Sequence, residues 1–469
     1  MPRNRTSNAP ELLLPLDREG AEPLHRQLEQ GIREAIRSGR LVADAALPSS
    51  RLLSEQLRVS RGVVVEAYEQ LTAEGYLAAR PGGATTVACI PARPATRPTV
   101  ASENRYRFDF RPGRPDLAEF PREEWLRSMR RALDGVPSER FGYLDGRGVP
   151  ELRHALAAYL DRVRGTCSDP EDVVISAGFS QGLGLIGRVL RDLGVRRVAM
   201  EDPSNPTYRL IMADLGIEAI AVPVDDDGMQ VDALGSTALE GVGAVVVTPA
   251  HQYPVGSVLT PDRRSALVAW ARRTGGYIVE DDYDAEYRYD REPIGAIQGL
   301  APERVIYAGT ASKTLAPGLR LGWLIAPGDL VGSLAGARLA LDSGAPVLDQ
   351  LAFADFLDQG ELDRHLRRVR PVYRARRDAL LDALSRHLPT LDPCGASAGL
   401  HVLAWLPDGT DERAVVGASV GAGVGLNGLT RRWFAPGGRS GLIFGYGVIP
   451  ERDVEPGIRL LAGAIAGLV

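Results

Sequence analysis

Short apolar runs alternate with stretches of helical periodicity from Phe108 onward, and this alternation constrains the fold more than any other feature. The runs are residues 173–175, 198–200, 219–222, 244–247, 277–279, 305–307 and 321–325. Such alternation is typical of βα repeats, in which mostly parallel strands form one sheet that helices cover. The sequence therefore predicts an α/β domain with one large, mostly parallel sheet over residues 108–469.

The first 88 residues have a different pattern. Helical periodicity covers residues 24–36 and 61–74, and a short helix is expected between them at 51–57, with Ser49 or Ser50 and Ser60 as N-caps. Two short strand-like runs follow, joined by a glycine-rich tip. Three helices and a hairpin in this order are typical of a winged helix-turn-helix, so residues 1–88 are predicted to bind DNA.

Residues 89–107 separate these two parts. The segment contains several prolines, has no periodicity and carries mainly arginine as charge. Such a composition favours a stiff, extended spacer that does not pack. It predicts a linker between two domains.

Composition excludes several classes of protein. A hydrophobic content of 44%, a charged content of 25% and a net charge of -5 are ordinary for a globular chain, although a small DNA-binding module fits within that average. Cys89, Cys167 and Cys394 match no metal or redox motif, so we predict no metal site and a reduced, cytoplasmic protein. No apolar stretch is long enough for a signal peptide or a membrane span.

Lys313 is the only lysine in 469 residues, and it follows the predicted strand 305–307. Unlike arginine, a buried lysine can lose its proton and attack a carbonyl carbon to form a Schiff base. Hydroxyl groups before the lysine and Arg320 after it are suited to a phosphate. The implied ligand is pyridoxal 5'-phosphate (PLP), although a lone surface lysine in an arginine-rich chain is the alternative.

Other strand ends carry side chains suited to the same ligand. Acidic residues 280–282 follow a buried strand, where charge is costly without a fixed cationic partner such as a protonated pyridine nitrogen. We therefore predict that Asp281 pairs with this nitrogen and that Tyr283 reaches the ring hydroxyl. The predicted phosphate ligands are Ser180, Gln181, Ser312 and Arg320.

Long motifs give the chain a specific resemblance. LPSSRLLSEQLRVSRGVVVEAYEQLTAEGYL resembles the GntR-type winged helix. FRPGRPD, FGYLDGRGVPELR, EDPSNP, TPAHQYPVG, EDDYDAEYRYD and GTASKTLAPGLRLGW complete a resemblance to the MocR/GabR family, from about residue 20 to the C-terminus. This family joins a winged helix to a fold type I aminotransferase-like domain with a smaller C-terminal α+β subdomain.

The resemblance implies specific residue roles. Lys313 would carry PLP as a Schiff base, with the other cofactor residues as predicted above, and Tyr143 would reach the site of the partner in a head-to-tail homodimer. The residues implied closest to operator DNA are Ser50, Arg51, Ser60, Arg61, Gly62 and, in the wing, Arg80. A winged helix that docks a protein is the alternative.

Two positions depart from the family pattern. Asn205 occupies the place of an aromatic residue that stacks on the ring, and Ile443 the place of an arginine that clamps an amino-acid carboxylate. Arg431, Arg432 and Arg439 are candidate substitutes. The departures favour a transcriptional regulator, with PLP itself as effector or, alternatively, an amine or amino-acid metabolite. An active aminotransferase with an appended regulatory module is the competing hypothesis.

Overall fold

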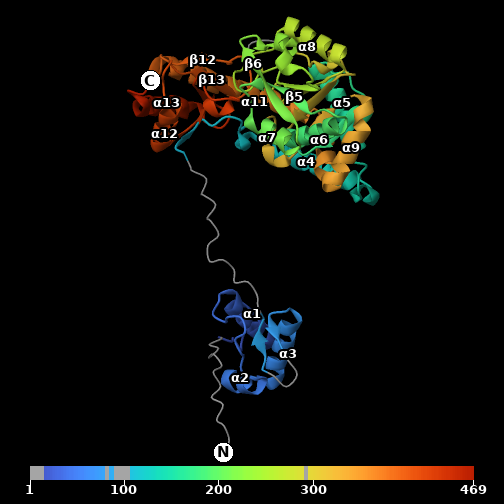
Figure 1. The fold of residues 1–469 in the computed structure, drawn as a ribbon, viewed down its shortest axis with the longest axis vertical. Helices are drawn as coiled ribbons and strands as arrows, with labels where there is room; N and C mark the ends of the chain where they lie inside the picture. The colour runs from blue at the N-terminus through green and yellow to red at the C-terminus, as the bar shows by residue number, and fades with distance from the viewer. Residues whose placement is uncertain (1–14, 80–83, 89–105, 290–293) are drawn as a thin grey trace, which may run out of the picture. The chain divides into compact units, whose positions relative to one another are not determined.

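The computed structural model describes residues 15–79, 84–88, 106–289 and 294–469. The chain forms two compact units, residues 1–104 and 105–469 (Figure 1). Arg80, Cys89 and residues 89–105 of the expected linker lie outside the described residues. Within the described ranges, no helix combines the length and apolarity that crossing a bilayer requires.

The N-terminal unit contains three helices and a two-stranded sheet, as expected. Its elements are α1 (Leu24–Arg37), α2 (Ser50–Leu57), α3 (Arg61–Ala73), β1 (Leu77–Ala78) and β2 (Thr86–Val87). The hydroxyl of Ser49 accepts from the N–H of Leu52, and that of Ser60 from Val63, so each serine caps a helix. Leu28, Leu53 and other apolar side chains from all three helices form one buried core. The predicted winged helix-turn-helix is confirmed.

The second unit is built on an eight-stranded sheet with the order β4-β11-β10-β9-β8-β5-β6-β7. Its strands are β4 (Val173–Ser176), β5 (Arg197–Asp202), β6 (Glu218–Asp225), β7 (Gly228–Met229), β8 (Ala244–Val247), β9 (Tyr277–Asp282), β10 (Val305–Thr310) and β11 (Gly322–Ile325). The pairs β10–β9, β9–β8, β8–β5 and β5–β6 are parallel, and β11 runs antiparallel to both of its neighbours. The predicted mostly parallel sheet is confirmed.

Helices cover both faces of this sheet. Successive side chains of β8 point to opposite faces, so Val246 packs in one core with α6 and α7, whereas Val245 and Val247 pack in another with α8 (Figure 1). The helices of this unit are α4 (Arg122–Gly135), α5 (Pro150–Arg164), α6 (Phe179–Asp192), α7 (Pro206–Asp214), α8 (Pro261–Thr274), α9 (Gly328–Asp342), α10 (Val347–Asp358), α11 (Glu361–His387), α12 (Glu412–Gly421) and α13 (Glu451–Ile465).

A smaller subdomain follows α11 and has its own sheet, in the order β12-β13-β16-β15. Its strands are β12 (Asp392–Cys394), β13 (His401–Trp405), β15 (Asn427–Gly428) and β16 (Gly441–Gly445). A separate pair joins β3 (Phe108–Asp109) to β14 (Val424–Gly425), so the start of the unit packs with its C-terminal part. The large sheet, with its parallel carboxyl ends at one edge, and this subdomain together position the site.

Candidate ligand-binding site

A cavity of about 410 Å³ lies at the carboxyl ends of the parallel strands, a usual place for ligands in open α/β sheets. Its lining includes Ser180, Asp281, Tyr283, Ser312, Lys313 and Arg320 among the residues expected from the sequence, together with Gly113, Phe179, Asn205, Tyr208, Tyr253, Asp284, Thr310, His401, Asn427 and Arg432. Side chains from separate strand ends therefore converge on one space.

Lys313 lies in the turn after β10. Its amine donates a hydrogen bond of 2.6 Å to the carbonyl oxygen of Gly113. Burial lowers the pKa of Lys313, although the charges of Asp284 and Asp281 oppose this effect. The lowered pKa increases the fraction of neutral amine, which is the nucleophilic form.

The acidic residues at the end of β9 have three different environments. Glu280 accepts from the backbone N–H groups of Ile297 and Gln298, at 2.9 and 3.0 Å. Asp282 accepts from the guanidinium of Arg164 at 2.7 Å, and its Oδ1 has no partner among the described residues.

Among the described residues, Asp281 has neither the backbone donors of Glu280 nor the guanidinium partner of Asp282. Its Oδ2 accepts from the Tyr208 hydroxyl at 2.6 Å, and its buried Oδ1 has no partner among the described residues. Burial raises the pKa of Asp281 well above its ordinary value, against the hydrogen bond from Tyr208. A cationic N–H placed in the cavity would satisfy both the free oxygen and the charge.

Tyr283, which lines the cavity, contacts His251 behind it. Its hydroxyl lies 3.2 Å from Nδ1 of His251, which is 3.0 Å from the Asp284 carboxylate. One ring nitrogen of His251, one of His401 and a carboxylate oxygen of Asp284 lie within 4.8 Å of one another. Burial opposes protonation of His251, but Asp284 raises its pKa, whereas burial lowers the pKa of His401 well below its ordinary value.

One end of the cavity is suited to an anion. Helix α6 begins there, since Phe179 and Ser180 line the cavity, and the first N–H groups of a helix have no acceptor within the helix. Gly178, with φ of +86°, precedes the helix, and a Cβ at this position would lie 2.9 Å from the Arg320 guanidinium. The hydroxyls of Thr310 and Ser312 are 2.8 Å apart at the same end. This end has the donors that a phosphate needs.

Gln181 does not line this cavity. Its Oε1 accepts from the N–H of Ala177 at 2.7 Å and from the Arg338 guanidinium, and its Nε2 donates to Asp342 at 2.9 Å. The side chain thus supports the loop before α6 rather than facing the cavity, and its expected contact with a phosphate stays a prediction.

Asn205 lines the cavity, but its side chain is hydrogen-bonded to the backbone. Its side chain accepts from the N–H of Thr207 at 3.1 Å and caps α7. Aromatic surface comes instead from Tyr208 and Phe179, whose ring centroids are 4.9 Å apart, and from Tyr253. A ligand ring in the cavity could therefore stack on these aromatic residues instead of on a residue at position 205.

Ile443 is fully buried on β16, in a cluster with Val255, Leu403 and Leu429, and it does not line the cavity. Among the candidate substitutes, Arg432 does line it, whereas the guanidinium of Arg439 lies 4.5 Å from the ring centroid of Trp405. Arg431 is exposed. The structure thus selects Arg432 from the three arginines.

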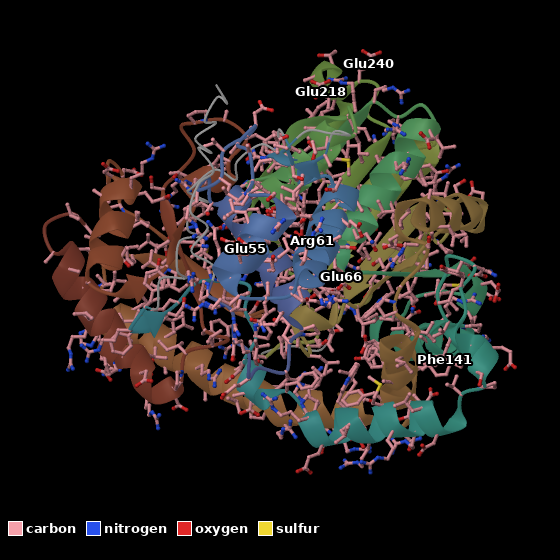
Figure 2. The ribbon with its side chains drawn as sticks, turned by 90° about the horizontal axis from the view of Figure 1, so that it is seen from below. Glu55, Arg61, Glu66, Phe141, Glu218 and Glu240 are labelled. Carbon is pink, nitrogen blue, oxygen red and sulfur yellow. The ribbon has the colours of Figure 1, made fainter. Side chains whose placement is uncertain are left out.

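Tyr143 is exposed over 93% of its surface. Phe141 nearby is 52% exposed and lies at the periphery of the second unit in Figure 2. Exposed aromatic side chains are common at protein interfaces. The expected contact of Tyr143 with a partner's site stays a prediction.

The residues expected at DNA, apart from Arg80, belong to α2, α3 and the N-cap of α3. The Arg61 guanidinium donates to the Ser50 hydroxyl at 3.4 Å, so the starts of α2 and α3 lie side by side. Arg51, Ser60, Arg61 and Gly62 are exposed. Among the described residues, a Cβ on Gly62 would meet only the Ser60 hydroxyl, at 3.8 Å, so a DNA backbone has room to approach this position.

Arg61→Ala is expected to weaken operator binding and to reduce its dependence on salt, because a phosphate contact releases about one counterion. The logarithmic salt slope should fall by about 1. Fluorescence anisotropy of labelled operator at several salt concentrations measures both effects. Arg26→Ala, which removes an exposed arginine from α1, is the charge-matched control. Equal salt slopes for wild type and Arg61→Ala would contradict a phosphate contact.

Comparisons with known proteins agree with this architecture. Residues 24–87 match the family model of bacterial regulatory proteins of the gntR family, and residues 113–407 match that of aminotransferase class I and II. An archaeal alanine:glyoxylate aminotransferase has a similar structure, with a TM-score of 0.72 and 29% identity, covering 77% of this chain and 91% of its own.

Two relatives are similar over nearly the whole chain. The probable rhizopine catabolism regulatory protein MocR of Rhizobium meliloti is 33% identical, covering 97% of this chain and 96% of its own. The pyridoxine biosynthesis transcriptional regulator PdxR of Corynebacterium glutamicum is 35% identical, covering 92% and 94%.

A gntR-type DNA-binding domain joined to an aminotransferase-like domain defines a class of HTH-type transcriptional regulators. The chain belongs to the MocR/GabR family of this class. The fold and the regulatory function expected from the sequence are thereby confirmed, as is the fusion of the two domains.

Sequence reasoning missed several cavity residues. Tyr208, His401 and Asn427 line the cavity but are not among the ligands predicted from the sequence. Tyr208 had a local signal, since it follows the EDPSNP motif and lies one helical turn after Asn205. His401 and Asn427 belong to the C-terminal subdomain, so only the tertiary fold brings them to the large sheet.

Proposed function

We propose that this regulator binds PLP covalently through Lys313 and that occupancy of the cavity sets its affinity for operator DNA. The observation that carries the proposal is the buried Oδ1 of Asp281, which has no partner among the described residues. A protonated pyridine nitrogen would supply the missing donor and the missing positive charge. The PLP-dependent enzymes that this fold resembles support the choice of ligand.

The chain's own residues fit each group of the cofactor. Lys313 would bond its aldehyde carbon, Asp281 would accept from its ring nitrogen, and Tyr283 would contact its ring hydroxyl. Ser180, Ser312, Arg320 and the N–H groups at the start of α6 would hold its phosphate. When bound, the cofactor supplies an electrophilic carbon to which amines add.

The regulatory step requires that the ligand state reaches the DNA-binding domains. We propose a cytoplasmic head-to-tail homodimer in which Tyr143 contacts the partner's site and closure around the ligand changes the spacing of two winged helices. The protein then acts as a sensor, and net amino transfer is not needed for its function. An assay of amino transfer separates this proposal from an active aminotransferase.

PLP itself is a second candidate for the effector. The buried Ile443 favours it, because an amino acid finds no arginine at the position that Ile443 occupies. In this case PLP alone would change operator affinity. If the effector is an amine or amino acid, operator affinity would change only when that ligand is added to the PLP-bound protein.

The first experiment is an absorbance titration of the purified full chain with PLP, read beside operator affinity at each step. We expect a visible band in the wild type that is absent in Lys313→Ala, and operator affinity that depends on the state of the cavity. A wild type without such a band would contradict covalent binding. A band whose presence leaves operator affinity unchanged, with PLP alone and with added amines, would contradict the sensor.

A further inference from the structure

A second cavity, of about 830 Å³, is lined by α8 and by the C-terminal subdomain. Its volume is within the range of about 300 to 1,000 Å³ that is usual for small-molecule sites. Among the described residues, it shares no lining residue with the cavity that contains Lys313. A ligand here would therefore be distinct from the one proposed at Lys313. The lining consists of Asp226, residues 255–261, Arg264, Ser265, Arg288, Ile294, Leu300 and residues 394–397.

Arg264 is a buried cation in this lining. Only 8% of its surface is exposed, and its Nη1 donates to the carbonyl oxygen of Gly295 at 2.7 Å. Its Nε and Nη2 are also buried and have no partner among the described residues. These two nitrogens form one edge of the guanidinium, which can donate a pair of parallel hydrogen bonds to a carboxylate or a phosphate. Because a buried charge is costly without a partner, this edge is suited to an anionic ligand.

The charges around Arg264 leave it in need of a further negative group. Burial lowers the pKa of Arg264, and the charges of Glu280 and Asp282 oppose this effect only in part. Asp226 is the only acidic residue among the described residues of the lining, and it is exposed, whereas Arg288 adds a second guanidinium to the lining. An anion in the cavity would supply the charge that compensates for the burial of Arg264.

The first turn of α8 adds further donors to this cavity. Residues 260–261 and 264–265 belong to the lining, so the helix begins at the cavity wall. Thr260, at the N-cap position, makes no capping hydrogen bond with its side chain, and the first N–H groups of a helix have no acceptor within it. The hydroxyl of Ser257 is buried and has no partner among the described residues. A guanidinium edge, a helix N-terminus and a hydroxyl together suit the several oxygens of a phosphate better than the two of a carboxylate.

We propose that this second cavity binds a phosphate group between Arg264 and the first turn of α8. The site lies outside the proposed PLP site and does not depend on it. The cavity is large enough for a phosphate ester of a small metabolite as well as for the free phosphate ion. Residues 394–397 of the lining belong to the C-terminal subdomain, so the lining joins this subdomain to the large-sheet domain.

The test uses the full chain, incubated with PLP, and the thiol of Cys394, which lines the second cavity. Mass spectrometry follows the rate at which iodoacetamide alkylates Cys394 while inorganic phosphate, glycerol 3-phosphate or glycerate is added at constant ionic strength. We expect both phosphates to slow this alkylation and to half-saturate at concentrations about tenfold or more below that of the carboxylate glycerate. The phosphate with the lower half-saturating concentration identifies the source of the group, the free ion or an ester. Cys167, which is exposed and outside the lining, should react at an unchanged rate.

Arg264→Met should abolish the protection of Cys394 by phosphates, because methionine fills similar space without a donor. Arg273→Met removes an exposed arginine from the same helix and should retain the protection. A wild type whose Cys394 reacts at the same rate at every phosphate concentration would overturn the proposal. So would glycerate that half-saturates within about twofold of both phosphates, or protection that survives in Arg264→Met. The wild-type titrations decide the first two of these outcomes even if Arg264→Met does not fold.

Discussion

Asp281→Asn is expected to weaken PLP binding by about a hundredfold or more while raising the stability of the protein without PLP. Removing one partner of a buried ion pair costs about 3 to 5 kcal/mol, and each 1.4 kcal/mol corresponds to about tenfold in affinity. Asparagine retains an oxygen that can accept from Tyr208, so the hydrogen bond of 2.6 Å can persist. The change therefore removes mainly the negative charge.

The opposite effect on stability follows from the raised pKa of Asp281. A carboxyl group whose pKa is higher in the folded than in the unfolded state binds more protons when folded. Its contribution to stability is present at low pH and is lost as pH rises above the unfolded value of about 3.9. Asparagine does not ionise, so the cost at neutral pH disappears.

Thermal unfolding with and without PLP, together with an absorbance titration, measures both effects. The midpoint without PLP should rise in Asp281→Asn, and the increase caused by PLP should shrink. Asp262→Asn changes an exposed carboxylate on α8 and is the matched control. A PLP affinity of Asp281→Asn within about threefold of the wild type would contradict the proposed pairing with the ring nitrogen.

The strands of the large sheet could be predicted because each is indicated by the residues of one short stretch of sequence. Each predicted run became a strand of one sheet, and the serines expected as caps, Ser49 and Ser60, do cap α2 and α3. The free-energy cost of burying consecutive acidic side chains at the end of β9 could also be predicted, since it depends only on burial and charge. These inferences need no knowledge of which distant residues come together.

Long-range partners could not be predicted in this way. Arg164, which neutralises Asp282, lies 118 positions before it, and Gln181 is drawn away from the cavity by Arg338, 157 positions after it. Arg432 has no local pattern that distinguishes it from Arg431. Arg432 lines the cavity, where its carbonyl oxygen accepts from the N–H of Ser204 and its guanidinium lies over the ring of Tyr253. Both contacts depend on the tertiary fold.

Asp282→Asn is expected to destabilise the whole second unit by about 3 to 5 kcal/mol, with or without PLP. Asp282 and Arg164 are buried, with side-chain exposures of 3% and 2%, so the substitution leaves a buried guanidinium without its counter-charge. The Tyr307 hydroxyl, 2.6 Å from the same carboxylate oxygen, can still donate to the asparagine oxygen. The loss is therefore mainly electrostatic.

Urea unfolding of wild type, Asp282→Asn, Arg164→Met and the double variant measures this ion pair. Either single change leaves a buried charge without its counter-charge, whereas the double change removes both charges. The double variant should therefore lose less stability than the two single variants combined. Additive losses would contradict the ion pair. The comparison with Asp281→Asn is the stronger test, because the two adjacent substitutions should change the free energy of unfolding without PLP in opposite directions. Asp282 is paired within the fold and stabilises it, so its loss should lower stability. Asp281 is proposed to pair with a ligand and destabilises the fold without one, so its loss should raise stability.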